Sequence, residues 1–167
     1  MRFGLETNYA ADADDLVVAY ADPALYAAFA DLPRASAPQV LAHRADGDTV
    51  HLRVRWFFSA DLAPAARRVI DPAKLTWVQE SAHDLVARTV SYVMVPDHYG
   101  DRFSCRGSYR FDPAAAVAGA VRRSDGDLRV KAPLVAKLVE NAIVSGLEDQ
   151  LRAEVPIVEA YLDGLDG

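Results

Sequence analysis

Four histidines and a single cysteine are the side chains of this sequence that most often bind metals or act as nucleophiles. The histidines, His43, His51, His83 and His98, are scattered along the chain, and none has the spacing of a metal ligand. A zinc site would have to combine them with the lone Cys105 in an unusual assembly. We therefore predict no metal site, and we expect the histidines at surface positions or at the ends of hairpins.

The sequence carries no motif of covalent or phosphate chemistry. Cys105 alternates with Phe103 and Tyr109, which is typical of a small core side chain, and no neighbouring base that would activate it is identifiable. A G-x-S-x-G nucleophile motif and a glycine-rich phosphate loop are both absent from the sequence. We predict no catalytic residues and no cofactor.

Tyrosine and arginine are the remaining side chains that can polarise a carbonyl group or move a proton inside a cavity. The candidates are Tyr9, Tyr92, Tyr109 and Arg88. Tyr109 is the strongest, because it shares a strand face with Phe103 and Phe111. The more common alternative is a core tyrosine whose hydroxyl reaches the backbone or water.

Length, composition and charge indicate one domain over residues 1–167. Hydrophobic residues make up 51% of the chain and charged residues 25%, as in a globular protein. The net charge of −6 disfavours nucleic-acid binding, and Arg53 with Arg55, or Arg122 with Arg123, more commonly form a solvated strand face than a basic patch. The polar N-terminal segment, the absence of a long apolar run and the single cysteine predict a cytoplasmic protein without an integral membrane segment.

Alternating hydrophobicity predicts a sheet of about seven strands. Val50, Leu52, Val54 and Trp56 share one face of the clearest strand, so the sheet has one dry face and one wet face. The predicted strands cover residues 2–9, 36–45, 49–59, 74–81, 85–95, 102–111 and 119–131.

Several connections are also predicted. The turn at 45–48 joins two strands in a hairpin, and a second hairpin turns around His83-Asp84. Two short helices follow the first strand, and 61–72 form a short helical connection. The pair Asp125-Gly126 is either a bulge within the last strand, which we favour, or a hairpin turn.

The longest helical pattern starts at Pro133 and carries one apolar stripe. Pro156 is expected to bend or break this helix near Arg152, because its ring clashes with the carbonyl four residues back. Val139, Ile143 and Val144 hint at a homodimer surface. The predicted stripe is Leu134, Leu138, Ala142, Leu147, Leu151, Val155, Val158 and Leu162.

The order of strand, two short helices, six strands and long amphipathic helix is similar to the START-like (SRPBCC) superfamily. In LRVKAPLVAKLVENAIVSGLEDQLRAEVPIVEAYL (128–162), a strand runs through K-x-P-L-V into the helix, and this segment resembles the actinobacterial domain of unknown function 2505 family. The resemblance covers essentially the whole chain. It implies an α+β helix-grip fold, in which a curved antiparallel sheet wraps around the C-terminal helix.

Members of this superfamily carry lipids, sterols, polyketides, plant hormones or quinones, and some are cyclases or partner-binding subunits. The resemblance therefore implies binding of a small hydrophobic ligand (lipid, isoprenoid or polyketide-like) between the sheet and the helix. The alternatives are a cyclase- or dehydratase-type enzyme that uses a cavity tyrosine or arginine, and a partner-protein-binding module with a collapsed cavity. The residues expected to bind the ligand are Leu52, Val54, Trp56, Trp77, Phe103, Tyr109, Leu138, Ala142 and Gly146.

The size of any cavity is constrained by stability. An empty cavity of roughly 300 Å³ would cost about 7 kcal/mol at ~24 cal/mol per Å³, which rivals the ~5–15 kcal/mol stability of a domain. A cavity must therefore be hydrated, occupied or collapsed. Trp56 and Trp77 favour partial collapse, whereas Ala142 and Gly146 leave room beneath the helix.

Overall fold

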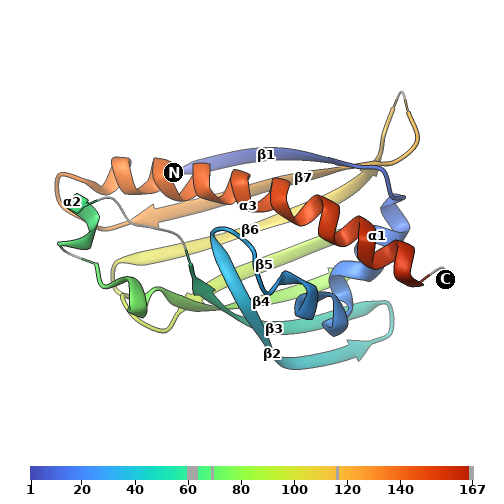
Figure 1. Ribbon diagram of the computed structural model, residues 1–167, viewed down its shortest axis with the longest axis horizontal. Coiled ribbons are helices and arrows are strands. Elements are labelled where there is room, and N and C mark those ends of the chain that lie inside the picture. Colours follow the sequence, from blue (N-terminus) through green and yellow to red (C-terminus); the bar gives the residue numbers. More distant parts are fainter. Residues whose placement is uncertain (60–63, 69, 116, 166–167) are drawn as a thin grey trace.

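A computed structural model describes residues 1–59, 64–68, 70–115 and 117–165. One seven-stranded sheet, in the order β1-β7-β6-β5-β4-β3-β2, lies beneath a long C-terminal helix, α3 (Figure 1). All neighbouring strands are antiparallel, and β1 and β2 form the two edges. The predicted α+β architecture is confirmed. No helix among the described residues combines the length and the apolar character needed to cross a membrane.

The elements follow the predicted order, with two short helices between the first two strands. Residues 61–63 and 69 of the predicted connection 61–72 lie outside the described residues. The strands are β1 (Arg2–Tyr9), β2 (Ala35–Asp46), β3 (Thr49–Phe58), β4 (Thr76–Asp84), β5 (Thr89–Pro96), β6 (Phe103–Pro113) and β7 (Ala120–Val130). The helices are α1 (Ala13–Ala21), α2 (Pro64–Arg67), α3 (Ala136–Leu165) and the 3-10 helices η1 (Pro23–Phe29) and η2 (Pro72–Lys74).

Local sequence explains two of the sharpest changes of direction. The β2–β3 hairpin has a two-residue loop whose first residue is Gly47, with φ of +59°, a conformation that glycine adopts without steric cost. At the start of η1, the Asp22 side chain accepts a hydrogen bond from the Ala24 amide at 2.9 Å, and Pro23 supplies a favourable first-turn residue.

The core lies between the inner face of the sheet and the layer formed by α1, η1 and α3 (Figure 1). Leu16 and Val17 of α1, Phe29 of η1 and Val158 of α3 are each at most 1% exposed. They meet inward strand residues such as Phe111, also 1% exposed. The predicted single dry face of the sheet therefore packs against helices.

Two predictions for the middle strands are wrong. His83 and Asp84 belong to β4, and the chain turns at 85–88, where Arg88 has φ of +57°. Arg88 is thus a turn residue and lies outside the strands. The strand β7 pairs with β1 and β6 without a register shift, so Asp125-Gly126 lie within one strand, as favoured, but form no bulge.

The predicted phase of the long helix is correct only in its C-terminal half. Leu151 and Val158 are buried, but Leu138 is 67% exposed and Leu134 precedes the helix. Residues at strict four-residue steps drift around a helix by about 40° per step, because the helix has 3.6 residues per turn. The helix also runs unbroken through Pro156, which is exposed.

His83 is a core residue, contrary to the prediction of a surface or hairpin-end position. Its ring is fully buried, and its Nε2 lies 2.9 Å from the Ser81 hydroxyl. Burial, with smaller contributions from the Arg122 and His51 charges, lowers the pKa of His83 to about 4. The imidazole is therefore neutral in the folded protein at neutral pH.

This burial predicts an acid-sensitive contribution to stability. The folded-state pKa of His83 lies below the unfolded value of about 6.5, so the unfolded chain binds the proton more tightly and stability falls as the pH drops from about 6.5 to about 4. Over that range the free energy of unfolding should fall by roughly 3 kcal/mol more in the wild type than in His83→Leu. Urea unfolding of both proteins at pH 7 and pH 4 measures the difference, and parallel pH curves would contradict it. His43→Leu, at an exposed position on β2, serves as the control.

Candidate functional site

A cavity of about 80 Å³ lies between the inner sheet face and α3. Liquid water occupies about 30 Å³ per molecule, so the space matches only two or three water molecules. Large aromatic side chains from η1 and the sheet account for this small size. The lining residues are Tyr20, Tyr26, Phe29, Ala35, Trp56, Trp77, Gln79, Tyr92, Met94, Tyr109, Arg122, Ser124, Leu147, Gln150, Leu151 and Glu154.

A buried ion pair forms the polar part of the cavity wall. Arg122 on β7 and Glu154 on α3 are each 7% exposed, and Arg122 Nη1 lies 3.3 Å from Glu154 Oε2. The Tyr20 hydroxyl donates to the same carboxylate oxygen at 2.8 Å. The Tyr9 hydroxyl lies 2.9 Å from that of Tyr20, so the network extends to β1. Three elements, α3, β7 and α1, thus meet at one carboxylate, and β1 joins the network through Tyr9.

Aromatic rings enclose the arginine. The guanidinium carbon of Arg122 lies 3.7 Å from the Tyr109 ring centroid and 4.9 Å from that of Tyr20. The face of an aromatic ring attracts a cation, and this attraction is larger where water is excluded. Arg122 is therefore held by two ring faces in addition to Glu154.

Burial sets the protonation states of the cluster. It raises the pKa of Glu154, against the opposing effects of Arg122 and of the Tyr20 hydrogen bond. Burial alone would lower the pKa of Arg122, but the tyrosines and Glu154 outweigh it and raise that pKa, so Arg122 stays charged. Burial also raises the pKa of Tyr109, and that of Tyr92 to about 12. Both tyrosines are therefore protonated hydrogen-bond donors at neutral pH.

Several polar groups around the cavity have no hydrogen-bond partner within the part of the chain that the structure describes. The buried atoms are Trp56 Nε1, Trp77 Nε1, Arg122 Nε and Ser124 Oγ. An unpartnered buried donor costs about 1–3 kcal/mol. The cavity wall thus has hydrogen-bonding capacity that its own residues do not use, and most of it consists of donors.

Three of the nine predicted ligand-binding residues line this cavity: Trp56, Trp77 and Tyr109. These include the only two tryptophans of the chain, which pair directly across β3 and β4. Leu52 and Val54 are buried on the same face of β3 but do not line it.

The other four predicted residues lie farther from it. Phe103 is half-buried and packs against the core, and Gly146 faces the Arg34 side chain, whose Cδ would lie 4.0 Å from an added Cβ. Leu138 and Ala142 are exposed, so their predicted inward orientation is wrong. The prediction used four-residue steps, and residues spaced in this way drift away from one face of a helix that has 3.6 residues per turn.

The central ion pair was not among the predicted site residues. Arg122 alternates with Ala120, Ser124 and Leu128 on the inner face of β7, and this alternation is visible in the sequence. The pair Arg122 and Arg123 predicts a solvated strand face, and this prediction is wrong for Arg122, which is buried. Glu154 likewise lies three residues after Leu151 on the buried face of α3.

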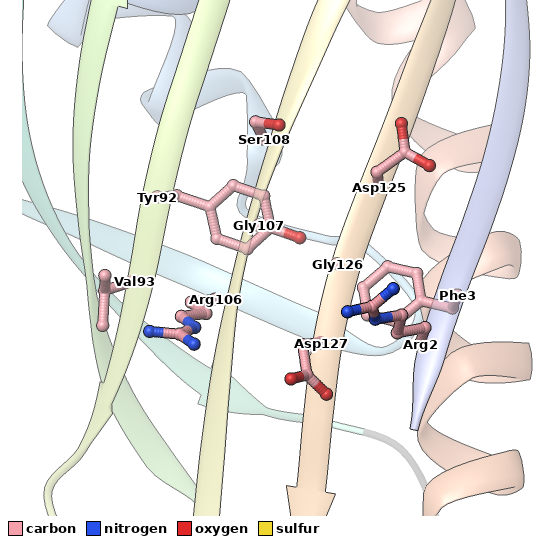
Figure 2. A pocket seen from close by; sticks show the side chains of 10 residues that line it. All are labelled: Arg2, Phe3, Tyr92, Val93, Arg106, Gly107, Ser108, Asp125, Gly126 and Asp127. Carbon is pink, nitrogen blue, oxygen red and sulfur yellow. The ribbon is translucent and has the colours of Figure 1, made fainter.

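A second, open depression of about 530 Å³ lies over the paired Gly107 and Gly126. Figure 2 shows the ring of Tyr92 lying over Gly107, and a Cβ at Gly107 would approach the Tyr92 hydroxyl to 2.7 Å. Glycine at this position therefore leaves room for Tyr92. The lining residues are Arg2, Phe3, Tyr92, Val93, Arg106, Gly107, Ser108, Asp125, Gly126 and Asp127.

Metal binding has no obvious location among the described residues, because no three or more His, Cys, Asp or Glu side chains are grouped to hold an ion. The chemistry available to the inner cavity is that of hydrogen-bond donors, one buried ion pair and aromatic faces.

Comparison with protein families gives one match. The family described as "Protein of unknown function (DUF2505)" matches residues 5–162. No curated protein matches the sequence.

Solved structures show the same fold at low sequence identity. TTHA0849 from Thermus thermophilus has a TM-score of 0.69 and 14% identity, and the alignment covers 100% of both chains. Norcoclaurine synthase from Thalictrum flavum, in complex with a transition-state analogue, has a TM-score of 0.60 and 19% identity over 96% of this chain and 95% of that chain. The di-domain ARO/CYC protein StfQ of the steffimycin biosynthetic pathway has a TM-score of 0.61 and 10% identity over 96% of this chain and 51% of its own. These matches establish the helix-grip fold.

The ion pair predicts non-additive effects of mutation on stability. Arg122→Met and Glu154→Leu should each destabilise the protein by about 3 kcal/mol or more, because each leaves a buried charge without its partner. The double variant should be more stable than either single variant. Urea unfolding of the four proteins at pH 7 measures this coupling, and additive losses would contradict it.

Lowering the pH separates the two single variants. Without the opposing Arg122 charge, burial raises the folded-state pKa of Glu154 further, so protonation favours the folded state. Arg122→Met should therefore regain stability relative to the wild type as the pH falls from 7 to 5. Arg122 without Glu154 cannot lose its proton in this range, so Glu154→Leu should show no such recovery. Equal recovery of both variants would show that the buried charge is not the cause.

Proposed function

The chain belongs to the DUF2505 family, and from that premise we propose that it binds a small hydrophobic molecule between the sheet and α3. The observation that carries the proposal is the inner cavity, which joins an aromatic wall to hydrogen-bonding groups that the protein leaves unused. Small-molecule sites typically combine an apolar lining with a few convergent polar groups that orient the ligand. The cavity has this composition.

The energetics of the half-open cavity favour occupation. If it were dry, a space of 80 Å³ would cost about 2 kcal/mol at ~24 cal/mol per Å³. A ligand that fills it regains this energy and supplies partners to buried donors, each of which costs about 1–3 kcal/mol when unpartnered. The cost of the empty cavity is small enough for the protein to fold before it binds a ligand.

The cavity size restricts the ligand classes suggested by the sequence. A lipid, isoprenoid or polyketide-like molecule can place only one compact end in 80 Å³. A longer part requires displacement of a wall residue such as Trp56, Trp77 or Leu147. We therefore propose that binding of a longer molecule moves at least one of these three side chains. The structure of norcoclaurine synthase with a transition-state analogue supports the idea that this fold accommodates a small organic molecule.

An enzyme of the cyclase or dehydratase kind is the second candidate. Tyr109 and Arg122 line the cavity beside Glu154, and Tyr109 keeps its proton because burial raises its pKa. A protonated tyrosine can donate to a carbonyl oxygen, and a carboxyl group with a raised pKa can hold or transfer a proton. These groups favour acid–base chemistry on a carbonyl compound over nucleophilic chemistry.

Binding is tested by native mass spectrometry of the protein purified gently from its own source, followed by organic extraction. We expect a stoichiometric apolar adduct. Leu147→Phe, which adds bulk to the cavity wall, should reduce its occupancy at least tenfold. Ile143→Phe, one helical turn earlier and outside the lining, should retain it. A clean mass for the wild type, with no indole resonance of Trp56 or Trp77 shifted by neutral hydrophobic probes, would refute the proposal.

The enzyme candidate is tested with the molecule recovered by extraction. If Tyr109 transfers a proton, Tyr109→Phe should slow conversion of this molecule by about 10²-fold or more, with a smaller change in Kd. Chromatography of timed incubations measures the conversion. Absence of any product from the wild type would eliminate the enzyme and leave the binding function intact.

A further inference from the structure

Two tyrosine hydroxyl groups on the cavity wall form no hydrogen bond with other described residues. Tyr109 and Tyr92 are 3% and 7% exposed, and both line the inner cavity. Neither hydroxyl makes a hydrogen bond to another residue in the described ranges, whereas the Tyr26 hydroxyl on the same wall donates to the Tyr20 carbonyl at 3.0 Å. Neither hydroxyl is among the fully enclosed, unpartnered atoms of the described residues, so each can be reached by water or by a ligand. Two reachable hydroxyl groups on neighbouring rings are therefore available to a ligand group.

These two tyrosines are adjacent and are suited to donate. Their ring centroids lie 6.3 Å apart at an interplanar angle of 42°. The Arg122 guanidinium lies 3.7 Å from the Tyr109 ring centroid, and a cation over the ring withdraws electron density from the phenol. Burial still raises the pKa of Tyr109 against this charge, so the hydroxyl keeps its proton and can donate it in a hydrogen bond.

The charge around the tyrosines disfavours an anionic ligand. Arg122 is already paired with Glu154 at 3.3 Å, so the pair has no net charge. A carboxylate next to Tyr109 would also approach the Glu154 carboxylate, which lines the same cavity, and in a medium of low dielectric this repulsion is strong. A neutral acceptor avoids the repulsion and still accepts both hydrogen bonds.

We propose that Tyr109 and Tyr92 bind the carbonyl oxygen of a neutral, compact ligand. This assignment rests on the proposed function, because both concern the same cavity. It adds the chemical group of the ligand that enters the cavity. The planar rings of Tyr109, Tyr92 and Trp77 favour a carbonyl conjugated to a flat apolar group. Arg122 acts as a positioning residue through its contact with the Tyr109 ring.

The test uses three probes of nearly equal shape. Acetophenone carries a neutral carbonyl, α-methylstyrene replaces that oxygen by a CH₂ group, and benzoate carries an anion. Binding is followed by NMR through the indole N–H resonances of Trp56 and Trp77, because both side chains line the cavity and the chain has no other tryptophan. We expect the wild type to bind acetophenone more tightly than benzoate.

Tyrosine-to-phenylalanine variants isolate the hydroxyl groups. Tyr109→Phe and Tyr92→Phe should each weaken acetophenone about threefold to tenfold and leave α-methylstyrene unchanged, as expected for loss of one hydrogen bond. Neither should lower the unfolding midpoint, because no intramolecular hydrogen bond is lost. The matched control Tyr26→Phe removes a cavity-wall hydroxyl that is bonded to the backbone. Tyr26→Phe should lower the stability of the protein without changing the ratio of its affinities for acetophenone and α-methylstyrene.

The outcomes separate this proposal from the proposed function. If α-methylstyrene binds but neither variant changes the affinity ratio, the cavity binds hydrophobic molecules and the carbonyl assignment is wrong. Tightest binding of benzoate would overturn the assignment in favour of an anion. If no probe shifts the indole resonances, both proposals fail.

Discussion

The buried pair of Arg122 and Glu154 constrains how the C-terminal helix sits on the sheet. Two charges removed from water lose much of their hydration energy, and their attraction compensates only when the geometry is good. Glu154 reaches Arg122 at 3.3 Å only when its face of α3 points at β7. The pair therefore selects one rotation of a helix whose apolar residues alone would tolerate several.

The aromatic residues around this pair determine the size and the chemistry of the cavity together. Tyr20 and Tyr109 place their faces against the guanidinium, and Trp56 packs against η1, where its ring lies 6.2 Å from that of Phe29. These rings reduce the cavity to about 80 Å³. They also bring hydroxyl and indole groups to the cavity wall, so the site is small and carries donors that the protein does not use.

The shared fold does not by itself identify the activity. Norcoclaurine synthase, an ARO/CYC protein and TTHA0849 have this architecture at 10–19% identity. One backbone supports different chemistry because side chains on the inner face can change without altering the strand pairing. The chemistry of this chain must therefore be argued from its own inner-face residues, above all the arginine on β7 and the glutamate on α3.

The sequence by itself determined the architecture, because strand alternation and helical amphipathicity are local patterns with fixed periods. It predicted the seven strands, the hairpin at Gly47, the long helix and the cavity residues Trp56, Trp77 and Tyr109. Errors arose where a short segment satisfies two patterns. Asp125-Gly126 has the composition of a turn, yet pairing on both sides holds it in a regular strand.

Only the tertiary structure decided which polar residues are inside. Arg122 and Glu154 lie 32 positions apart in the chain, and neither is favourable in a core without the other. Burial of His83 likewise depends on the layer packed above β4, which its neighbours in sequence do not reveal. Local patterns specify the face of an element, whereas the burial of a charge depends on a partner that long-range packing supplies.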